Sequence, residues 1–199
     1  DRRRAERLGM SLRQALEMTS VTDVGQARSQ NEDFVAVDAE CGLAILADGM
    51  GGYSAGEIAS GMTVTLLMQG LKAQLNKLAP EPDALETLVR ELVATVNAAV
   101  YETACTRPQC AGMGTTLVLA VFHDNRLLAA HIGDSRLYRL RGNQLTQLTR
   151  DHSLVQEQID SGMLSQEEAP WSSNKNLVTR ALGVDPEVPL DVSVYDAAP

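Results

Sequence analysis

The sequence has no apolar run long enough to cross a membrane, and it has few basic residues. None of its hydrophobic stretches reaches about 18 residues, and there is no secretory signal pattern. The chain carries 17 Lys and Arg against 26 Asp and Glu, which gives a formal net charge of −9. Because binding to a nucleic-acid backbone requires a basic surface, this balance argues against nucleic acid as the main partner.

Cysteine is also scarce. Cys41, Cys105 and Cys110 are an odd number with one loose pair, which is not the pattern of a disulfide framework. The spacing of Cys105 and Cys110 would allow a metal site or a bridge, although two reduced thiols are the more ordinary interpretation. We therefore expect a protein of the reducing cytoplasm.

The common motifs of nucleophilic and nucleotide chemistry are missing. The chain has no Gly-x-Ser-x-Gly, no phosphate-binding loop of the Gly-x4-Gly-Lys type, and no histidine in an obvious pairing with a cysteine. Neither a serine or cysteine hydrolase nor a P-loop nucleotide-binding protein is therefore supported.

The 199 residues, 44% of them hydrophobic, suffice for one substantial domain. Residues 1–17 are rich in arginine and predict a basic helix or a linker, followed by a domain over residues 18–199. The apolar periodicity predicts strands first, then two long helices, then a four-stranded antiparallel meander, a short helix and a last strand. Such segregated elements favour an α+β fold. The expected elements are strands over 19–24, 34–38 and 42–48, helices over 54–78 and about 85–100, the meander over 114–149, a helix over 151–161 and a strand over 186–196.

Acidic residues stand beside glycine at three strand ends or turns. These are the pair Glu32 and Asp33, then Asp48, and Asp134. Hard divalent cations prefer several oxygen ligands on a fixed backbone, and the missing Cβ at Gly49 would let the neighbouring carbonyl approach an ion. A single Asp-Gly after a strand is a common turn, but the glycines that follow Asp48 are more than one turn requires.

Other polar residues allow both a functional and a structural interpretation. Arg28 could hold a phosphate by two oxygens, or could simply be solvated. Asp134 could serve a metal or occupy a hairpin turn, and His152 is structural in the more ordinary case. Asp151 could cap the helix expected after it. Glu32 and Asp33 are adjacent, so on a strand they would face opposite sides.

Six blocks in order resemble the bacterial metal-dependent protein serine/threonine phosphatases of the 2C type. The blocks, which extend over about residues 20–199, are TDVGQARSQNED, ILADGMGGYSAGEIAS, GMGTTLVLA, HIGDSRLYRLR, LTRDHSLV and LVTRALG. The resemblance implies an α-β-β-α sandwich of two antiparallel sheets between helices. It also implies hydrolysis of phosphoserine and phosphothreonine in proteins, opposing a cognate serine/threonine kinase.

The resemblance implies two Mn²⁺ or Mg²⁺ ions, with a third held more weakly. Asp48 would bridge the two ions, and the Gly49 carbonyl with Glu32 and Asp33 would serve the second ion directly or through water. Asp134 would help to hold the third ion. Arg28 would bind the substrate phosphate, and a water between the two ions would be the nucleophile.

The sequence departs from the family in two places. Members often carry a histidine in or just after the Asp-Gly turn, where this chain has Met50 and Tyr53, so the proton donor is open between a water, His152 and no residue. The family also continues with further strands that supply two more metal aspartates. This sequence stops before them, so we expect the C-terminal strands to be missing and these residues alone to be weak or inactive.

Two other functions fit part of this pattern. The first is a non-catalytic pseudophosphatase that binds phosphoproteins and regulates a partner. Five polar groups at one site, namely those of Arg28, Glu32, Asp33, Asp48 and Asp134, argue against it. The second is a metal hydrolase of small phosphate esters or nucleic acid, which the net charge of −9 disfavours.

Overall fold

The structure is a computed structural model that describes residues 12–26, 28–52, 55–75, 77–78 and 83–197. Most of the basic segment expected over residues 1–17 lies outside these ranges, and within them only the short helix α2 belongs to it. The helices and strands are α2 (Leu12–Ala15), β1 (Asp33–Asp38), β2 (Leu43–Met50), α3 (Ala55–Leu75), α4 (Ala84–Thr106), β3 (Gly114–Thr115), β4 (Leu117–His123), β5 (Arg126–Ile132), β6 (Tyr138–Arg141), β7 (Gln144–Gln147), α5 (Leu154–Asp160) and β8 (Asp191–Asp196).

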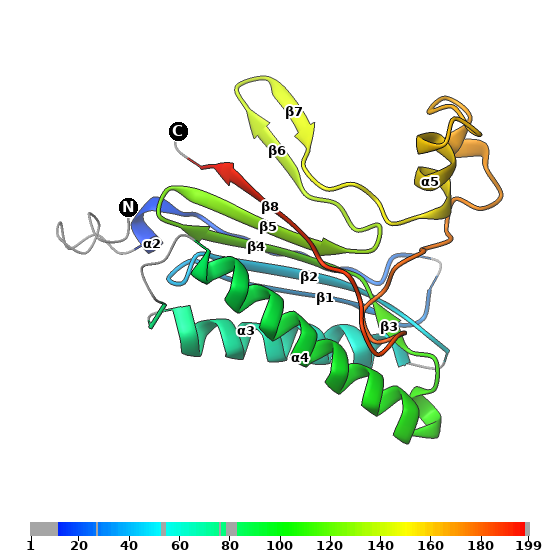
Figure 1. Cartoon of the computed structure of the whole chain (residues 1–199), viewed down its shortest axis with the longest axis horizontal. Coiled ribbons are helices and arrows are strands. Elements are labelled where there is room, and N and C mark those ends of the chain that lie inside the picture. The colour runs from blue at the N-terminus through cyan, green and yellow to red at the C-terminus, as the bar shows by residue number, and fades with distance from the viewer. Residues whose placement is uncertain (1–11, 27, 53–54, 76, 79–82, 198–199) are drawn as a thin grey trace.

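A six-stranded antiparallel sheet organises the described residues. Its strand order is β1-β2-β4-β5-β8, and β3 extends it by pairing with the end of β2. Helices α3 and α4 pack against one face of this sheet, and the separate β6–β7 hairpin stands on the opposite side (Figure 1). The α+β class with antiparallel sheets and flanking helices is therefore confirmed.

Strand β2 runs through the middle of this arrangement and explains why one carboxylate leaves the core. Leu43, Ile45 and Ala47 are fully buried toward the helices, and the residues between them are more exposed. Since side chains alternate across a strand, Asp48 lies on the face opposite the helices. Helix α4 completes the layer with a buried stripe at helical spacing, made up of Val89, Val93, Val96 and Val100.

Two expected strands are wrong, one of them entirely and the other in its bounds. Residues 19–24 form no strand, and Val21 there is 87% exposed. The β-branched residues of this segment favour a strand by propensity. Such a preference leads to a strand only where a neighbouring strand and a buried face support it. The strand expected over residues 114–124 is divided at Thr116, because β3 pairs with β2 alone and β4 with both β2 and β5.

The expected four-stranded meander is also wrong. Strands β4 and β5 pair, and so do β6 and β7, but β5 takes β8 as its second neighbour instead of β6. The chain leaves the large sheet at Gly133, whose φ of +99° suits glycine and turns the backbone away from the ladder. Periodicity finds strands, but it does not determine which strand pairs with which.

The helix expected over residues 151–161 begins later than Asp151. Ser153 is the N-cap, and its hydroxyl accepts a hydrogen bond from the backbone N–H of Gln156. Asp151 is not the cap, because its carboxylate accepts from Arg136 instead. The prediction of a helix here is thus confirmed, and the capping role of Asp151 is wrong.

Two sequence expectations about the whole chain can be compared with the described residues. All three cysteines have free thiols, with Cys110 buried and Cys105 exposed. Within the described ranges, no helix combines the length and the apolar character that crossing a bilayer would need.

Candidate metal centre

The carboxylates of two adjacent strands meet at one end of the large sheet. In the register of β1 and β2, Asp33 lies directly opposite Asp48. Directly opposed residues on neighbouring strands have their Cβ atoms about 4.5–5.5 Å apart, so their side chains interact. The structure therefore brings together two of the residues expected at a metal site.

Asp48 lies in an environment that opposes its own ionisation. Loss of hydration at the strand end, followed by the neighbouring Asp33 carboxyl and the charge of Asp134, raises the pKa of Asp48 to about 6. The positive charge of Arg28 acts in the opposite direction. Three other residues predicted as site residues, Asp33, Asp134 and Arg28, are thus close enough to influence the Asp48 carboxylate.

The backbone of Gly49 packs with unusual closeness against the start of α3. A Cβ at this position would lie 2.1 Å from the carbonyl oxygen of Gly56 and 2.7 Å from that of Glu32. The Gly49 N–H donates to this Glu32 carbonyl at 3.0 Å, and the Ser60 hydroxyl of α3 donates to it at 2.6 Å. Glycine at position 49 thus lets three parts of the chain converge beside Asp48: strand β2, the backbone of Glu32 just before β1, and the first turn of α3.

Arg28 reaches this strand end from the segment before β1. Its Nη1 donates to the Glu32 carboxylate at 3.0 Å, while 72% of its side chain remains exposed. The Glu32 side chain is only 15% exposed, and its Oε1 lies beside Gly56 in the first turn of α3. Glu32 therefore holds one side of the guanidinium and leaves the rest open to solvent.

Two threonines that sequence reasoning missed fix the backbone of Asp48. The Asp48 N–H donates to the Thr116 hydroxyl at 3.0 Å, and the Thr115 hydroxyl and Thr116 N–H both donate to the Asp48 carbonyl at 2.9 Å. The Thr116 hydroxyl also hydrogen-bonds to that of Ser135 at 2.7 Å. Both threonines are buried, so the ends of β2, of β3 and of the Asp134 turn are joined within the protein.

Replacing Thr116 with valine is expected to destabilise the protein by about 1–3 kcal/mol, because it removes the buried hydroxyl that accepts from the Asp48 N–H and leaves that N–H without its acceptor. Valine keeps the shape and removes only the hydroxyl. The free energy of unfolding in urea measures the effect. Thr95→Val is the matched control, since the Thr95 hydroxyl bonds only a carbonyl one turn back on the exposed side of α4. Equal stability of the two variants would contradict the prediction.

Asp134 does not lie in a hairpin turn between paired strands, as the structural interpretation would have it. It follows Gly133 at the point where the chain leaves the large sheet, and its charge acts on Asp48. His152 is 7% exposed, and its Nδ1 accepts a hydrogen bond from the backbone N–H of Gly133. A buried ring occupied in this way does not suit the role of proton donor to a substrate.

The arrangement fits a divalent cation. Asp33, Asp48 and Asp134 offer carboxylate oxygens, the ligands that Mg²⁺ and Mn²⁺ prefer, and their mutual repulsion would be relieved by a bound positive charge. No thiol or histidine contributes among the described residues of this strand end. Carboxylates at one strand end of an antiparallel α+β fold are compatible with the class of metal-dependent hydrolases that act through a bound divalent ion.

Comparison with known proteins identifies the family to which the chain belongs. The model of the protein phosphatase 2C family matches residues 25–173, and the chain belongs to this family, whose members are metal-dependent. The serine/threonine phosphatase stp of Listeria welshimeri is 41% identical over 177 residues, which cover 87% of this chain and 69% of that protein.

Solved structures agree with the sequence comparison. The serine/threonine phosphatase Stp1 of Staphylococcus aureus superposes with a TM-score of 0.80 at 33% identity, over 87% of this chain and 68% of that one. The catalytic domain of the phosphatase PstP, solved with two manganese ions, gives a TM-score of 0.75 at 38% identity, over 88% and 70% of the two chains. The resemblance inferred from six sequence blocks is confirmed.

Proposed function

We propose that the protein hydrolyses phosphoserine and phosphothreonine in other proteins and so opposes a cognate serine/threonine kinase in the cytoplasm. The observation that carries this proposal is the opposed pair Asp33 and Asp48, with Asp134 and Arg28 close enough to act on Asp48. Membership of the protein phosphatase 2C family supports the same reaction class. Relatives at about 40% identity carry the name serine/threonine phosphatase.

The proposed metal ligands come from three parts of the fold. Asp48 and the Gly49 carbonyl at the end of β2, with Glu32 and Asp33 before and at the start of β1, would hold two Mn²⁺ or Mg²⁺ ions. Asp134 would help to hold a third. The bound ions supply a water of lowered pKa as nucleophile and neutralise charge on the phosphate. The two manganese ions bound by PstP, a protein of similar fold, support this choice of metal.

Arg28 is the proposed phosphate-binding residue. Its guanidinium is held on one side by Glu32 and is otherwise exposed, so further N–H donors are available to two phosphate oxygens. The contact with Glu32 restrains the side chain before substrate arrives, which lowers the entropy lost on binding. Arg28 thus aligns the phosphate, and Asp48 and Asp33 provide the negative charge that retains the ions.

The full-length protein is expected to release phosphate from a phosphothreonine peptide with Mn²⁺ or Mg²⁺, and to lose this activity in excess chelator. Activity should return when Mn²⁺ is restored, because the carboxylates remain in place on a sheet that is folded without metal. Phosphate release measured colorimetrically tests this, with phosphorylated DNA ends as a comparison substrate. Binding of the peptide without any release, at every Mn²⁺ concentration, would contradict catalysis and identify a phosphoprotein-binding module instead.

A further inference from the structure

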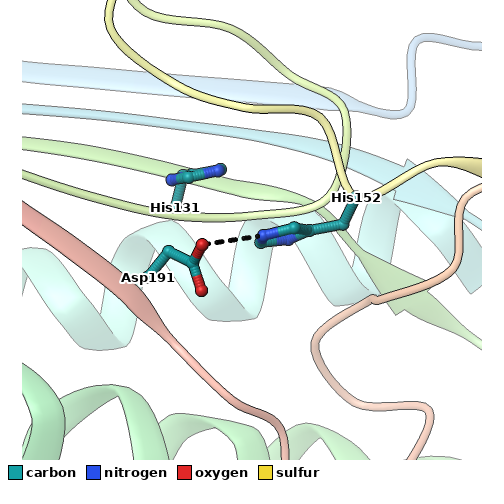
Figure 2. A group of neighbouring side chains, drawn as sticks. All are labelled: His131, His152 and Asp191. Carbon is teal, nitrogen blue, oxygen red and sulfur yellow. Dashed lines mark ion pairs between the residues drawn. The ribbon is translucent and has the colours of Figure 1, made fainter. Parts of the chain in front are cut away.

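A buried polar cluster lies beside the Asp134 turn, and the proposed reaction makes no use of it. His131 of β5 and His152 before α5 are 8% and 7% exposed, and their rings stack with centroids 4.7 Å apart. The Nε2 atom of His152 lies 3.3 Å from a carboxylate oxygen of Asp191 at the start of β8 (Figure 2). Two histidines and a carboxylate in contact are the residues of many metal sites.

The geometry does not suit a metal ion. An imidazole nitrogen offers its lone pair in the plane of the ring, but the two ring planes are only 14° from parallel, so their lone pairs do not converge on one point (Figure 2). His131 Nε2 donates to the carbonyl of Arg150 at 2.7 Å and therefore carries a proton. The Arg180 guanidinium already neutralises Asp191 at 2.8 Å and lies 3.1 Å from His152 Nε2, where it would repel a cation.

The hydrogen bonds fix one tautomer of His152. The Gly133 N–H can only donate, so the Nδ1 atom that it contacts at 3.0 Å must be the acceptor. The ring proton is then on Nε2, where it is directed to Asp191. Burial lowers the pKa of His152, which agrees with a neutral ring. His152 is therefore an oriented acceptor for one backbone amide.

That amide is next to a proposed metal ligand. Gly133 immediately precedes Asp134. In addition to the bond to the His152 ring, the backbone N–H of His152 donates to the Gly133 carbonyl at 2.9 Å. The neighbouring residues are joined as well, because Arg136 donates from Nε and Nη2 to the Asp151 carboxylate at 2.6–3.0 Å. The segment from Gly133 to Arg136 is thus fastened at its two ends to residues 152 and 151.

We propose that His152 is a positioning residue, oriented by Asp191, whose carboxylate is in turn paired with Arg180, and that it fixes the Gly133 backbone and so sets the place of the Asp134 carboxylate relative to Asp48. This inference rests on the proposed role of Asp134 in metal binding. It assigns the site a dependence on β8, a strand that contributes none of the predicted metal ligands. Partners behind a metal ligand commonly change metal affinity by about 10–100-fold when they are removed.

The test compares two replacements of His152 in the full-length protein. His152→Ala removes both ring nitrogens, whereas His152→Asn places an amide oxygen near the position of Nδ1 and so can still accept from Gly133. His123→Ala, at the end of β4, controls for loss of a histidine elsewhere. Hydrogen exchange of the Gly133 amide in metal-free protein measures how firmly the His152 ring holds that amide. Calorimetric titration with Mn²⁺ reports the site, and thermal melting checks the fold of each variant.

We expect His152→Ala to speed Gly133 exchange and to weaken the weakest Mn²⁺ site by about tenfold, with most of both effects reversed in His152→Asn. Unchanged Gly133 exchange in His152→Ala would overturn the proposal, as would faster exchange with unchanged Mn²⁺ binding. Asp134→Asn and Asp48→Asn are titrated in parallel. If only Asp48→Asn weakens Mn²⁺ binding, the positioning role is overturned and the proposed function stands. If the wild-type protein binds no Mn²⁺, the proposed function itself fails.

Discussion

Asp48→Asn is expected to lower Mn²⁺-dependent phosphate release from a phosphothreonine peptide by about 10³-fold or more, the largest loss of activity among single substitutions in this chain. A metal that polarises water and phosphate contributes several kcal/mol to the barrier, and each 1.4 kcal/mol is about tenfold in rate. Asparagine is nearly the same shape but has no negative charge. Calorimetry should show the corresponding loss of Mn²⁺ binding, which separates a failure to hold metal from a failure of chemistry.

The same substitution is not expected to unfold the metal-free protein. Asp48 is opposed by the charges of Asp33 and Asp134, so removing its charge relieves repulsion. Its backbone hydrogen bonds to Thr115 and Thr116 do not involve the carboxylate. The urea midpoint of Asp48→Asn should therefore equal or exceed that of the wild type. Unchanged or higher stability together with lost activity is the usual result of replacing an active-site residue that destabilises the folded protein.

Asp124→Asn is the matched control, because Asp124 is an exposed aspartate in the β4–β5 turn, at a φ of +48° that asparagine tolerates. It should keep both Mn²⁺ binding and activity. If Asp48→Asn retains wild-type Mn²⁺ affinity and phosphate release, the strand end is not the metal centre, and the role given to Asp33 fails with it.

Local pattern was sufficient for the elements that carry the site. The apolar run before Asp48 predicts β2, and the helical spacing after Pro82 predicts α4; both are present. These segments were predictable because their burial is strong and regular along the chain. The placement of Asp48 at a strand end beside glycine was likewise visible in the sequence.

Contacts between distant segments were not predictable from the same pattern. The sequence contains Asp33 and Asp48, but only the antiparallel register of β1 and β2 puts them opposite each other. The hydroxyl of Thr116 joins Asp48 to Ser135 across 68 and 19 residues of sequence. His152 was singled out, but not its contact with Gly133. A polar side chain in a strand carries no local sign of the partner that its burial requires.

The glycines after Asp48 show how such a contact can nevertheless be anticipated. Their number suggested that the backbone, not a side chain, is needed there. The structure requires glycine at only one of the two positions compared: Gly49 has the carbonyl of Gly56 within 2.1 Å of its missing Cβ, whereas Gly52 has nothing within 4 Å. One glycine is required by packing, and the other leaves room that an alanine could fill.

Gly49→Ala is therefore expected to destabilise the metal-free protein by about 3 kcal/mol or more, above the ordinary cost of overpacking. The new methyl group would meet backbone atoms of Gly56 and Glu32, which cannot rotate away as a side chain can. Relief requires α3 to move off the end of β2, which breaks the bond from the Ser60 hydroxyl of α3 to the Glu32 carbonyl. Urea unfolding followed by circular dichroism measures the loss.

Gly52→Ala is the control within the same turn, and we expect its stability to stay within about 0.5 kcal/mol of the wild type. The comparison isolates close packing from a general effect of alanine on a glycine-rich turn. Should Gly49→Ala unfold at the wild-type urea concentration, α3 begins farther from β2 than the structure places it. The convergence of Asp48, Glu32 and the first turn of α3, on which the metal centre is built, would then need a different explanation.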